Sequence, residues 1–533
     1  MLNRIIEWSL RNQFLMVVAL VLVVIGGVWA VRDMRLDAIP DLSDVQVIVY
    51  TKFPGQAPQV VEDQVTYPIS SKMLSVPHAK VVRGYSFFGF SFVYVIFDDG
   101  TDLYWARSRV LEYLSGLSAQ LPDGVVPQLG PDATGVGWAF MYALNSPSRS
   151  LAELRSYQDW YLKYGLVSVE GVAEVATFGG FVRQYQVEVD PLKMRSYGIP
   201  LSRIKEAIKD SNRDVGGRLL EVSEREFMVV GRGYVRDVRD LEQIPLDVAA
   251  GGTPILLKDI ANVAIGPEIR RGIAEWNGRG ETVGGIVVVR DGADTLDVIS
   301  RVKERLADLR EGLPDDVTIE VGYDRTHLIH AAIETLTRTL IEESIIVALV
   351  CAVFLFHFRS ALVAILSIPV SILASFIVMH LQGLGANIMS LGGIAISIGV
   401  LVDAAVVMVE NAHKHYEEWQ GRRSHFEIIL RSAQEVGPTL FFTLLVITVS
   451  FMPVFTLQAQ EGRLFRPLAF TKTYAMAASA LLAVTVVPVL MYWFVRGRIR
   501  GEDRHPVSRL LRAAYTPVIR IVLRARWIVI ALA

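Results

Sequence analysis

Apolar residues gather in one long run near the start of the 533-residue chain and in a dense group of runs in its second half. Residues 14–31 contain no charged side chain over 18 positions. A bilayer core about 30 Å thick needs about 20 helical residues at 1.5 Å each, so this run predicts a transmembrane helix. A secretory signal peptide is the alternative, but the run is longer than a usual signal core and no small-residue cleavage site follows it.

Five further apolar runs follow closely on one another after about 300 residues without a comparable one. Their spacing is too dense for buried helices of a soluble domain. We therefore predict transmembrane spans near 338–356, 361–381, 387–409, 438–457 and 471–495, and a seventh that begins at Trp527. With the first run, the pattern predicts at least six complete spans.

Basic residues orient these spans, because short cytoplasmic loops of membrane proteins are rich in Lys and Arg. Residues 496–526 hold nine arginines against two carboxylates and predict a basic helix along the cytoplasmic surface, with Pro517 as a candidate break. The loop 410–437 is predicted to be cytoplasmic as well. Met1 then lies in the cytoplasm and residues 33–336 lie outside it.

The outer segment alternates strand and helix patterns in the order of a split βαβ, or ferredoxin-like, unit. The first unit is predicted to have strands near 45–50, 80–87 and 91–97 and helices near 57–75 and 102–119. A second unit is predicted to have strands near 138–144, 172–178, 283–289 and 316–322 and helices near 151–168 and 295–309. An insertion at roughly 182–272 interrupts it. The predicted fold class is therefore an α+β membrane protein, a transmembrane helix bundle with ferredoxin-like outer subdomains.

Composition agrees with this class, since 52% of the residues are hydrophobic and 20% are charged. The net charge of −2 gives no reason to expect a nucleic-acid partner. The single cysteine, Cys351, excludes an internal disulfide and a cysteine zinc cluster. The outer segment has no P-loop, no H-E-x-x-H and no G-x-S-x-G motif, so the sequence predicts no enzyme. Transport would need an ion gradient or a partner as its energy source.

One acidic residue, Asp403, lies inside a predicted span. A carboxylate at that depth costs about 2.5–3.5 kcal/mol on insertion scales, so it is expected to face a partner or a water path. Two readings remain: a carboxyl group that takes up and releases protons, which we favour, and a static ion pair. The sequence places no Lys or Arg in the middle of a span, so either the basic partner lies on missing sequence or Asp403 stays neutral at rest. Glu410 and Asn411 are expected to mark the cytoplasmic end of this helix.

Methionines lie on two of the predicted spans. Met389 and Met408 are 19 residues apart on the Asp403 helix. Met476 and Met491 are 15 residues apart on the last complete span. Both spans run from outside to inside, so we expect Met389 to share the outer depth with Met476, and Met408 to share the inner depth with Met491. Thioether pairs suit a soft monovalent cation such as Cu(I) or Ag(I), although spacing alone favours ordinary packing.

Five longer stretches carry a family resemblance: FPGQAPQVVEDQVTYPISSKMLSVPHAKVVRGYS, DGTDLYWARSRVLEYL, LGPDATGVGW, ANIMSLGGIAISIGVLVDAAVVMVENAHK and EGRLFRPLAFTKTYAMA. They resemble the first half of resistance-nodulation-division (RND) efflux transporters. The likeness is to the heavy-metal branch, in particular to Cus/Sil-type copper and silver pumps, and it covers essentially the whole chain.

This resemblance implies a homotrimeric, proton-driven exporter in the bacterial inner membrane, working with a periplasmic adaptor and an outer-membrane channel. Asp403 matches the proton-relay aspartate of the family. The methionines proposed to pass metal through the membrane match Met389, Met408, Met476 and Met491. No resident cofactor is implied, because Cu(I) or Ag(I) is the substrate.

Two departures from the family patterns bear on the metal. The Cus-type pattern has a methionine two residues before the aspartate, where this chain has Leu401, so the middle rung of the methionine path is in doubt. The zinc/cobalt branch has a second aspartate where this chain has Ser397, and Asp-Gly-Ala where it has Asp-Ala-Ala from Asp403. The second departure favours monovalent copper or silver.

The resemblance also divides the chain into domains. They are a first helix (1–32), a first porter subdomain (33–132), a second porter subdomain (133–181 and 273–330) with a docking insertion (182–272), transmembrane helices two to six (331–495), the basic surface helix (496–526) and the start of a seventh span (527–533). The chain is expected to be a fragment, with the periplasmic metal site in the missing half. The rival hypotheses are an RND exporter of divalent metals or organic drugs and a non-transporting membrane assembly or sensor protein.

Overall fold

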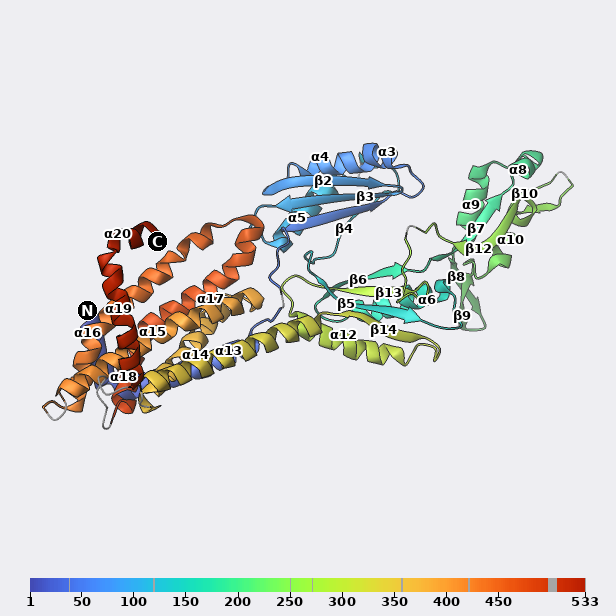
Figure 1. The fold of residues 1–533 in the computed structure, drawn as a ribbon. Coiled ribbons are helices and arrows are strands. Elements are labelled where there is room, and N and C mark those ends of the chain that lie inside the picture. Colours follow the sequence, from blue (N-terminus) through green and yellow to red (C-terminus); the bar gives the residue numbers. More distant parts are fainter. Residues whose placement is uncertain are drawn as a thin grey trace.

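A computed structural model describes the chain except residues 38, 118–119, 250, 271, 356–357, 420–421, 497–505 and 533. Figure 1 shows a bundle of long helices at one end and sheets flanked by helices at the other. The sheets belong to the segment between the first long helix and the remaining ones, here called the outer domain. This arrangement agrees with the predicted α+β class.

The first sheet of the outer domain has the strand order β2-β3-β1-β4, and all neighbours are antiparallel. Its strands are β1 (Gln46–Lys52), β2 (Ala79–Phe87), β3 (Phe90–Phe97) and β4 (Pro127–Leu129). Its helical segments are α3 (Pro58–Val61), η1 (Glu62–Thr66), α4 (Tyr67–Met73) and α5 (Leu103–Ser115). Val47 and Val49 are fully buried on one face of β1, as the two-residue strand period requires.

The second sheet repeats this topology with the order β14-β5-β13-β6. Its strands are β5 (Trp138–Asn145), β6 (Val172–Gly179), β13 (Val283–Val289) and β14 (Thr318–Asp324). Its helical segments are α6 (Leu151–Tyr157), η3 (Gln158–Leu162), α7 (Lys163–Val167) and α12 (Thr295–Arg310). Counted along the chain, both sheets have their strands in the order 4-1-3-2, the ferredoxin-like arrangement predicted from the sequence.

The insertion into the second sheet has its own small core, which includes Ile204, Leu246 and Ile260. Its first and last strands, β7 (Arg183–Val189) and β12 (Ala261–Pro267), pair with each other. Between them lie α8 (Pro191–Tyr197), α9 (Leu201–Ser211), β8 (Val215–Val222), β9 (Arg225–Gly231), α10 (Val238–Glu242), β10 (Pro245–Val248), β11 (Pro254–Leu256) and α11 (Leu257–Ile260). Because the paired end strands close the insertion, it folds as a unit of its own.

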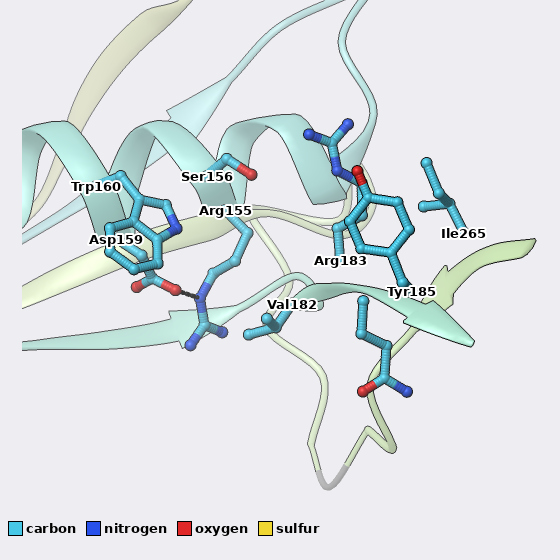
Figure 2. A pocket seen from close by; sticks show the side chains of 9 residues that line it. Arg155, Ser156, Asp159, Trp160, Val182, Arg183, Tyr185 and Ile265 are labelled. Atoms are coloured by element: carbon cyan, nitrogen blue, oxygen red, sulfur yellow. Dashed lines mark hydrogen bonds and ion pairs between the residues drawn. The ribbon is translucent and has the colours of Figure 1, made fainter. Parts of the chain in front are cut away.

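A surface pocket marks the joint between the second sheet and the insertion. Figure 2 shows side chains from α6 and η3 on one side and from β7 and β12 on the other. Its central arginine, Arg155, is fully engaged, with an ion pair of 2.7 Å to Asp159 and a hydrogen bond of 2.9 Å to the Gly179 carbonyl oxygen. Both partners belong to the second unit, so these contacts hold Arg155 between its helix and the end of β6.

The bundle contains α1 (Leu2–Arg11), α2 (Gln13–Asp33), α13 (Arg325–Leu355), α14 (Phe358–Leu381), α15 (Ile388–Trp419), α16 (His425–Ser450), η4 (Met452–Thr456), α17 (Ala459–Val484), α18 (Val486–Phe494), α19 (Pro506–Arg524) and α20 (Arg526–Leu532). In the described part of the chain, five helices are long and apolar enough to cross a membrane: α2, α14, α15, α16 with η4, and α17. The predicted run 338–356 lies on α13, apart from residue 356, which is not described.

Several predicted boundaries are wrong. The run 471–495 begins twelve residues earlier, at Ala459, and is divided at Thr485 into α17 and α18. Most of the predicted loop 410–437 is helical, because α15 continues to Trp419 and α16 begins at His425. Pro517 does not break α19. In the first two cases a helix extends past the apolar run into polar residues, which an apolar window excludes.

Candidate transmembrane site

Helix α15 carries three of the predicted site residues, and its start is fixed by a side-chain cap. The Asn387 Oδ1 atom accepts hydrogen bonds of 3.0 Å from the backbone N–H groups of Met389 and Ser390. Such a cap satisfies N–H groups that have no partner within the helix. Met389 therefore lies in the first turn of α15, where its side chain is half-buried.

Helix α17 packs closely along α15 and in the same direction. A Cβ atom at Gly393 would lie 2.3 Å from the Thr471 Oγ1 atom and 2.5 Å from the Leu468 carbonyl oxygen, so the two backbones approach as only glycine permits. Further along both helices, Ala404 and Ala480 belong to one buried cluster. From the first contact to the second, the residue numbers increase by about eleven on both helices. The helices are therefore parallel, and each residue of α17 lies at the same depth as an identifiable residue of α15.

Met408 and Met491 are brought together. Both side chains are fully buried, and both belong to one packed cluster at the end of the bundle that includes α1 and α18. Leu401 lies seven residues, or two turns, before Met408, hence on the same face of α15. It is 2% exposed and packs in the neighbouring cluster with Ala475.

The expected pairing of Met389 with Met476 at one depth is wrong. Met476 is fully buried on α17, five to eight residues past the contact with Gly393. This places it level with about residue 400 of α15, near Leu401. At 1.5 Å per residue, Met389 lies about 15 Å further along the bundle. The expectation failed because it assumed that α17 begins near residue 471.

Asp403 lies midway along α15, and its side chain is outside the described residues. The basic partner expected for Asp403 stays a prediction.

A lysine that the sequence reading placed at the end of a span lies in the middle of α17. Lys472 is 6% exposed, and its Nζ atom lies 3.4 Å from the centroid of the Phe451 ring. The expectation that no Lys or Arg lies in the middle of a span is therefore wrong. By the register with α15, Lys472 lies about 10 Å from the level of Asp403 along the helix axis.

The outer end of α17 is joined to the first sheet by Arg463. Its Nη1 atom donates a hydrogen bond of 3.0 Å to the Leu42 carbonyl oxygen, and its Nη2 atom pairs at 3.0 Å with Asp44 and also with Asp99. The hydrogen bond from Arg463 holds the pKa of Asp99 below its usual value. Sequence reasoning missed both Arg463 and Lys472. The signal that could have found them is their place in the stretch EGRLFRPLAFTKTYAMA, which leads into the apolar run. A helix extended backwards through this stretch includes both residues.

The described residues offer no group of three or more His, Cys, Asp or Glu side chains placed to hold a metal ion. What the bundle places together is a pair of buried thioethers on α15 and α18, a buried lysine and thioether on α17, and a midway carboxyl residue on α15.

Comparison with known proteins identifies the class. Residues 5–533 match the AcrB/AcrD/AcrF family. The chain therefore belongs to this family of RND transporters, and the predicted resemblance is confirmed.

Individual relatives show which branch of the family this chain is similar to. The chain is 53% identical to the putative cation efflux system protein SilA of Salmonella typhimurium and to the cation efflux system protein CusA of Escherichia coli K12, over 98% of this chain and 51% of each relative. It is 34% identical to the cobalt-zinc-cadmium resistance protein CzcA of Cupriavidus metallidurans, over 97% of this chain and 50% of that protein. The chain thus spans about half the length of these relatives.

A solved structure agrees. The crystal structure of a heavy metal efflux pump matches with a TM-score of 0.81 at 32% identity, over 92% of this chain and 48% of that one. The predicted fold class is confirmed by this match and by the two sheets.

Proposed function

We propose that this chain is part of a permease that exports Cu(I) or Ag(I) across the bacterial inner membrane in exchange for protons. The observation that carries the proposal is the buried cluster shared by Met408 and Met491, in a chain 53% identical to two cation efflux proteins. Thioether sulfur is a soft ligand that prefers Cu(I) to hard divalent ions. Met389 and Met476 serve as further ligands along the path.

In the mechanism we propose, Asp403 takes up a proton from the outer side and releases it to the cytoplasm. Protonation removes a charge from the middle of α15, and α15 then shifts against α17. Arg463 ties α17 to the first sheet, so this shift reaches the outer domain and opens or closes its cleft. The protein is thus a secondary antiporter and not an enzyme.

We propose a homotrimer that places residues 33–336 in the periplasm and binds an adaptor protein and an outer-membrane channel there. The β8–β9 hairpin supports self-association, because every residue of both strands is exposed. Phe227 and Met228 are 52% and 84% exposed in it. An isolated two-stranded hairpin is at best marginally stable in water, so this arm needs a surface to pack on.

Copper and silver tolerance tests the proton relay. The full gene is placed in a strain that lacks its own pump, with and without Asp403→Asn. We expect the tolerated metal concentration to fall to the level of the empty strain, while Asp210→Asn, an exposed substitution on α9, changes nothing. Unchanged tolerance with Asp403→Asn would support the non-transporting alternative.

Methionine variants separate metal export from drug export. Met408→Leu and Met491→Leu keep the apolar volume but remove the thioether. We expect each to lower silver tolerance, whereas Met73→Leu, at a fully buried position of the first sheet's core, has no effect. Equal tolerance for all three variants would favour an exporter of organic drugs.

A further inference from the structure

Lys472 is a buried charge that the proposed proton and metal path does not use. Its ammonium group lies over the Phe451 ring at the end of α16, a cation–π contact. The structure gives it no ion pair with a carboxylate among the described residues, and only 6% of the residue is exposed. Ionisable residues within membrane spans are costly and are retained where they serve a function.

The position of Lys472 relative to Met476 suggests that function. The two residues are four apart on α17, so they lie on one face of the helix, one turn from each other. Both are buried. The rise between them is about 6 Å. The backbone positions of a candidate cation ligand and of a positively charged residue therefore lie one helical turn apart.

Repulsion between two such charges is large in a partly buried site. For a separation of about 6–8 Å between the ammonium group and the cation, and an effective dielectric constant near 20, one unit charge weakens the binding of a monovalent cation about 30- to 100-fold. For a divalent cation, the factor by which binding is weakened is the square of this value. A neutral thioether supplies no negative charge to offset this repulsion.

We propose that Lys472 is an electrostatic barrier in the cation path and determines which ions occupy Met476. Its charge keeps the binding of a soft monovalent cation weak enough for the ion to leave, which conduction through successive sites requires. The same charge disfavours divalent ions much more strongly. This inference rests on the proposed function, because it takes Met476 as a cation ligand.

The test is Ag(I) and Cd(II) affinity of the complete purified protein, measured by competition with a chelator. We expect Lys472→Leu to raise Ag(I) affinity at least about tenfold and Cd(II) affinity by a larger factor. Lys472→Arg should bind as the unchanged protein does, because it keeps the charge. Lys193→Leu, at an exposed position of α8, is the control for net charge. Lys472→Gln carries the same prediction if the leucine variant does not fold.

The variant Met476→Leu shows whether the higher cation affinity of Lys472→Leu arises at Met476. In the double variant the gain from Lys472→Leu should disappear, since the sulfur that benefits is gone. If neutral substitutions at Lys472 leave affinity unchanged or lower it while Met476→Leu weakens binding, the barrier is refuted and the metal path stands. If Met476→Leu alone has no effect on Ag(I) binding, Met476 is not a ligand, and both the barrier and that step of the proposed path are wrong.

Discussion

The two sheets of the outer domain have the same strand order but are joined to the membrane helices in different ways. The second sheet is continuous with the bundle, since β14 ends at Asp324 and α13 begins at Arg325. The first sheet is joined to α2 by residues 34–45, which form neither helix nor strand where they are described. Further ties to the bundle are polar contacts: this linker pairs with the backbone of Ala386 and with Arg325, and the loops of the first unit contact Arg463 on α17.

The joint of the second sheet is also the more deeply buried. The Arg325 side chain is 6% exposed, pairs at 2.8 Å with Asp37 and donates a hydrogen bond to the Val136 carbonyl oxygen. Arg463 is 16% exposed, and its partners Asp44 and Asp99 are 50% and 35% exposed. The second sheet should therefore move together with α13, whereas the first is held by contacts that water can replace.

This difference assigns separate roles to two similar units. A continuous joint carries the motion of α13 directly into the second sheet, whereas a contact made of partly exposed polar groups can form and break during a cycle. We expect the second sheet to follow α13 and the first sheet to report the position of α17, the helix that carries Lys472 and Met476.

The largest effect is expected from breaking the buried joint. Arg325→Ala removes the hydrogen bond to the Val136 carbonyl oxygen and the ion pair with Asp37, and should lower stability by about 2–3 kcal/mol. The midpoint temperature of unfolding of the purified protein would fall by several degrees. Arg310→Ala, at the exposed end of α12, is the control. Equal midpoints for the two variants would show that the second sheet is not held through Arg325.

A second prediction concerns the close packing of α17 against α15. Gly393→Ala places a methyl group against the Leu468 backbone and should cost about 1–3 kcal/mol and most of the metal tolerance. Gly392→Ala, at a neighbouring position with open space, should be tolerated. Tolerance assays and thermal unfolding of both variants check this. Similar behaviour of the pair would contradict the close approach of the two helices.

Breaking the contact between Arg463 and the first unit should affect transport more than stability. Arg463→Ala should cost only about 1 kcal/mol, because water replaces the lost partners of two half-exposed carboxylates. Metal tolerance should nevertheless fall markedly, since α17 loses the Arg463 contacts with the first unit. Arg466→Ala, exposed and one turn further along α17, should keep full tolerance. A stable Arg463→Ala variant with full tolerance would refute the role of this joint.

The smallest effect is expected from pH. Because the hydrogen bond from Arg463 lowers the pKa of Asp99, the contact is fully present above the ordinary aspartate pKa of about 4. It is lost only as the pH falls through the lowered value. Protease cleavage at residues 34–45 should therefore be constant between about pH 5 and 8 and rise only in stronger acid. A rise already near pH 6 would show that another group controls the joint.

The sequence predicted the two sheets of the outer domain well because several of their strands and helices carry local signals. Val47 and Val49 on β1 and the Ser150–Glu153 capping box of α6 are such local signals. The membrane helices were harder. An apolar window recognises only the part of a helix in contact with lipid, so it missed the outer half of α17, where Arg463 faces protein.

The site was predicted in part for the same reason. Asp403 and the four methionines stand out by residue type, and the pairing of Met408 with Met491 follows from counting spans. The depth of Met476 depends on where α17 begins and on its register with Gly393, which is a tertiary contact. Lys472 could not be assigned to the interior until that boundary was known.

The most direct test of proton-driven export uses the complete protein in sealed lipid vesicles with a pH-sensitive dye inside. Adding Ag(I) on the side from which the protein exports it should drive protons across the membrane in the opposite direction. The account predicts that this proton movement requires Asp403 and is absent in Asp403→Asn, although that variant still binds Ag(I). Equal Ag(I)-dependent proton movement in both proteins would contradict it.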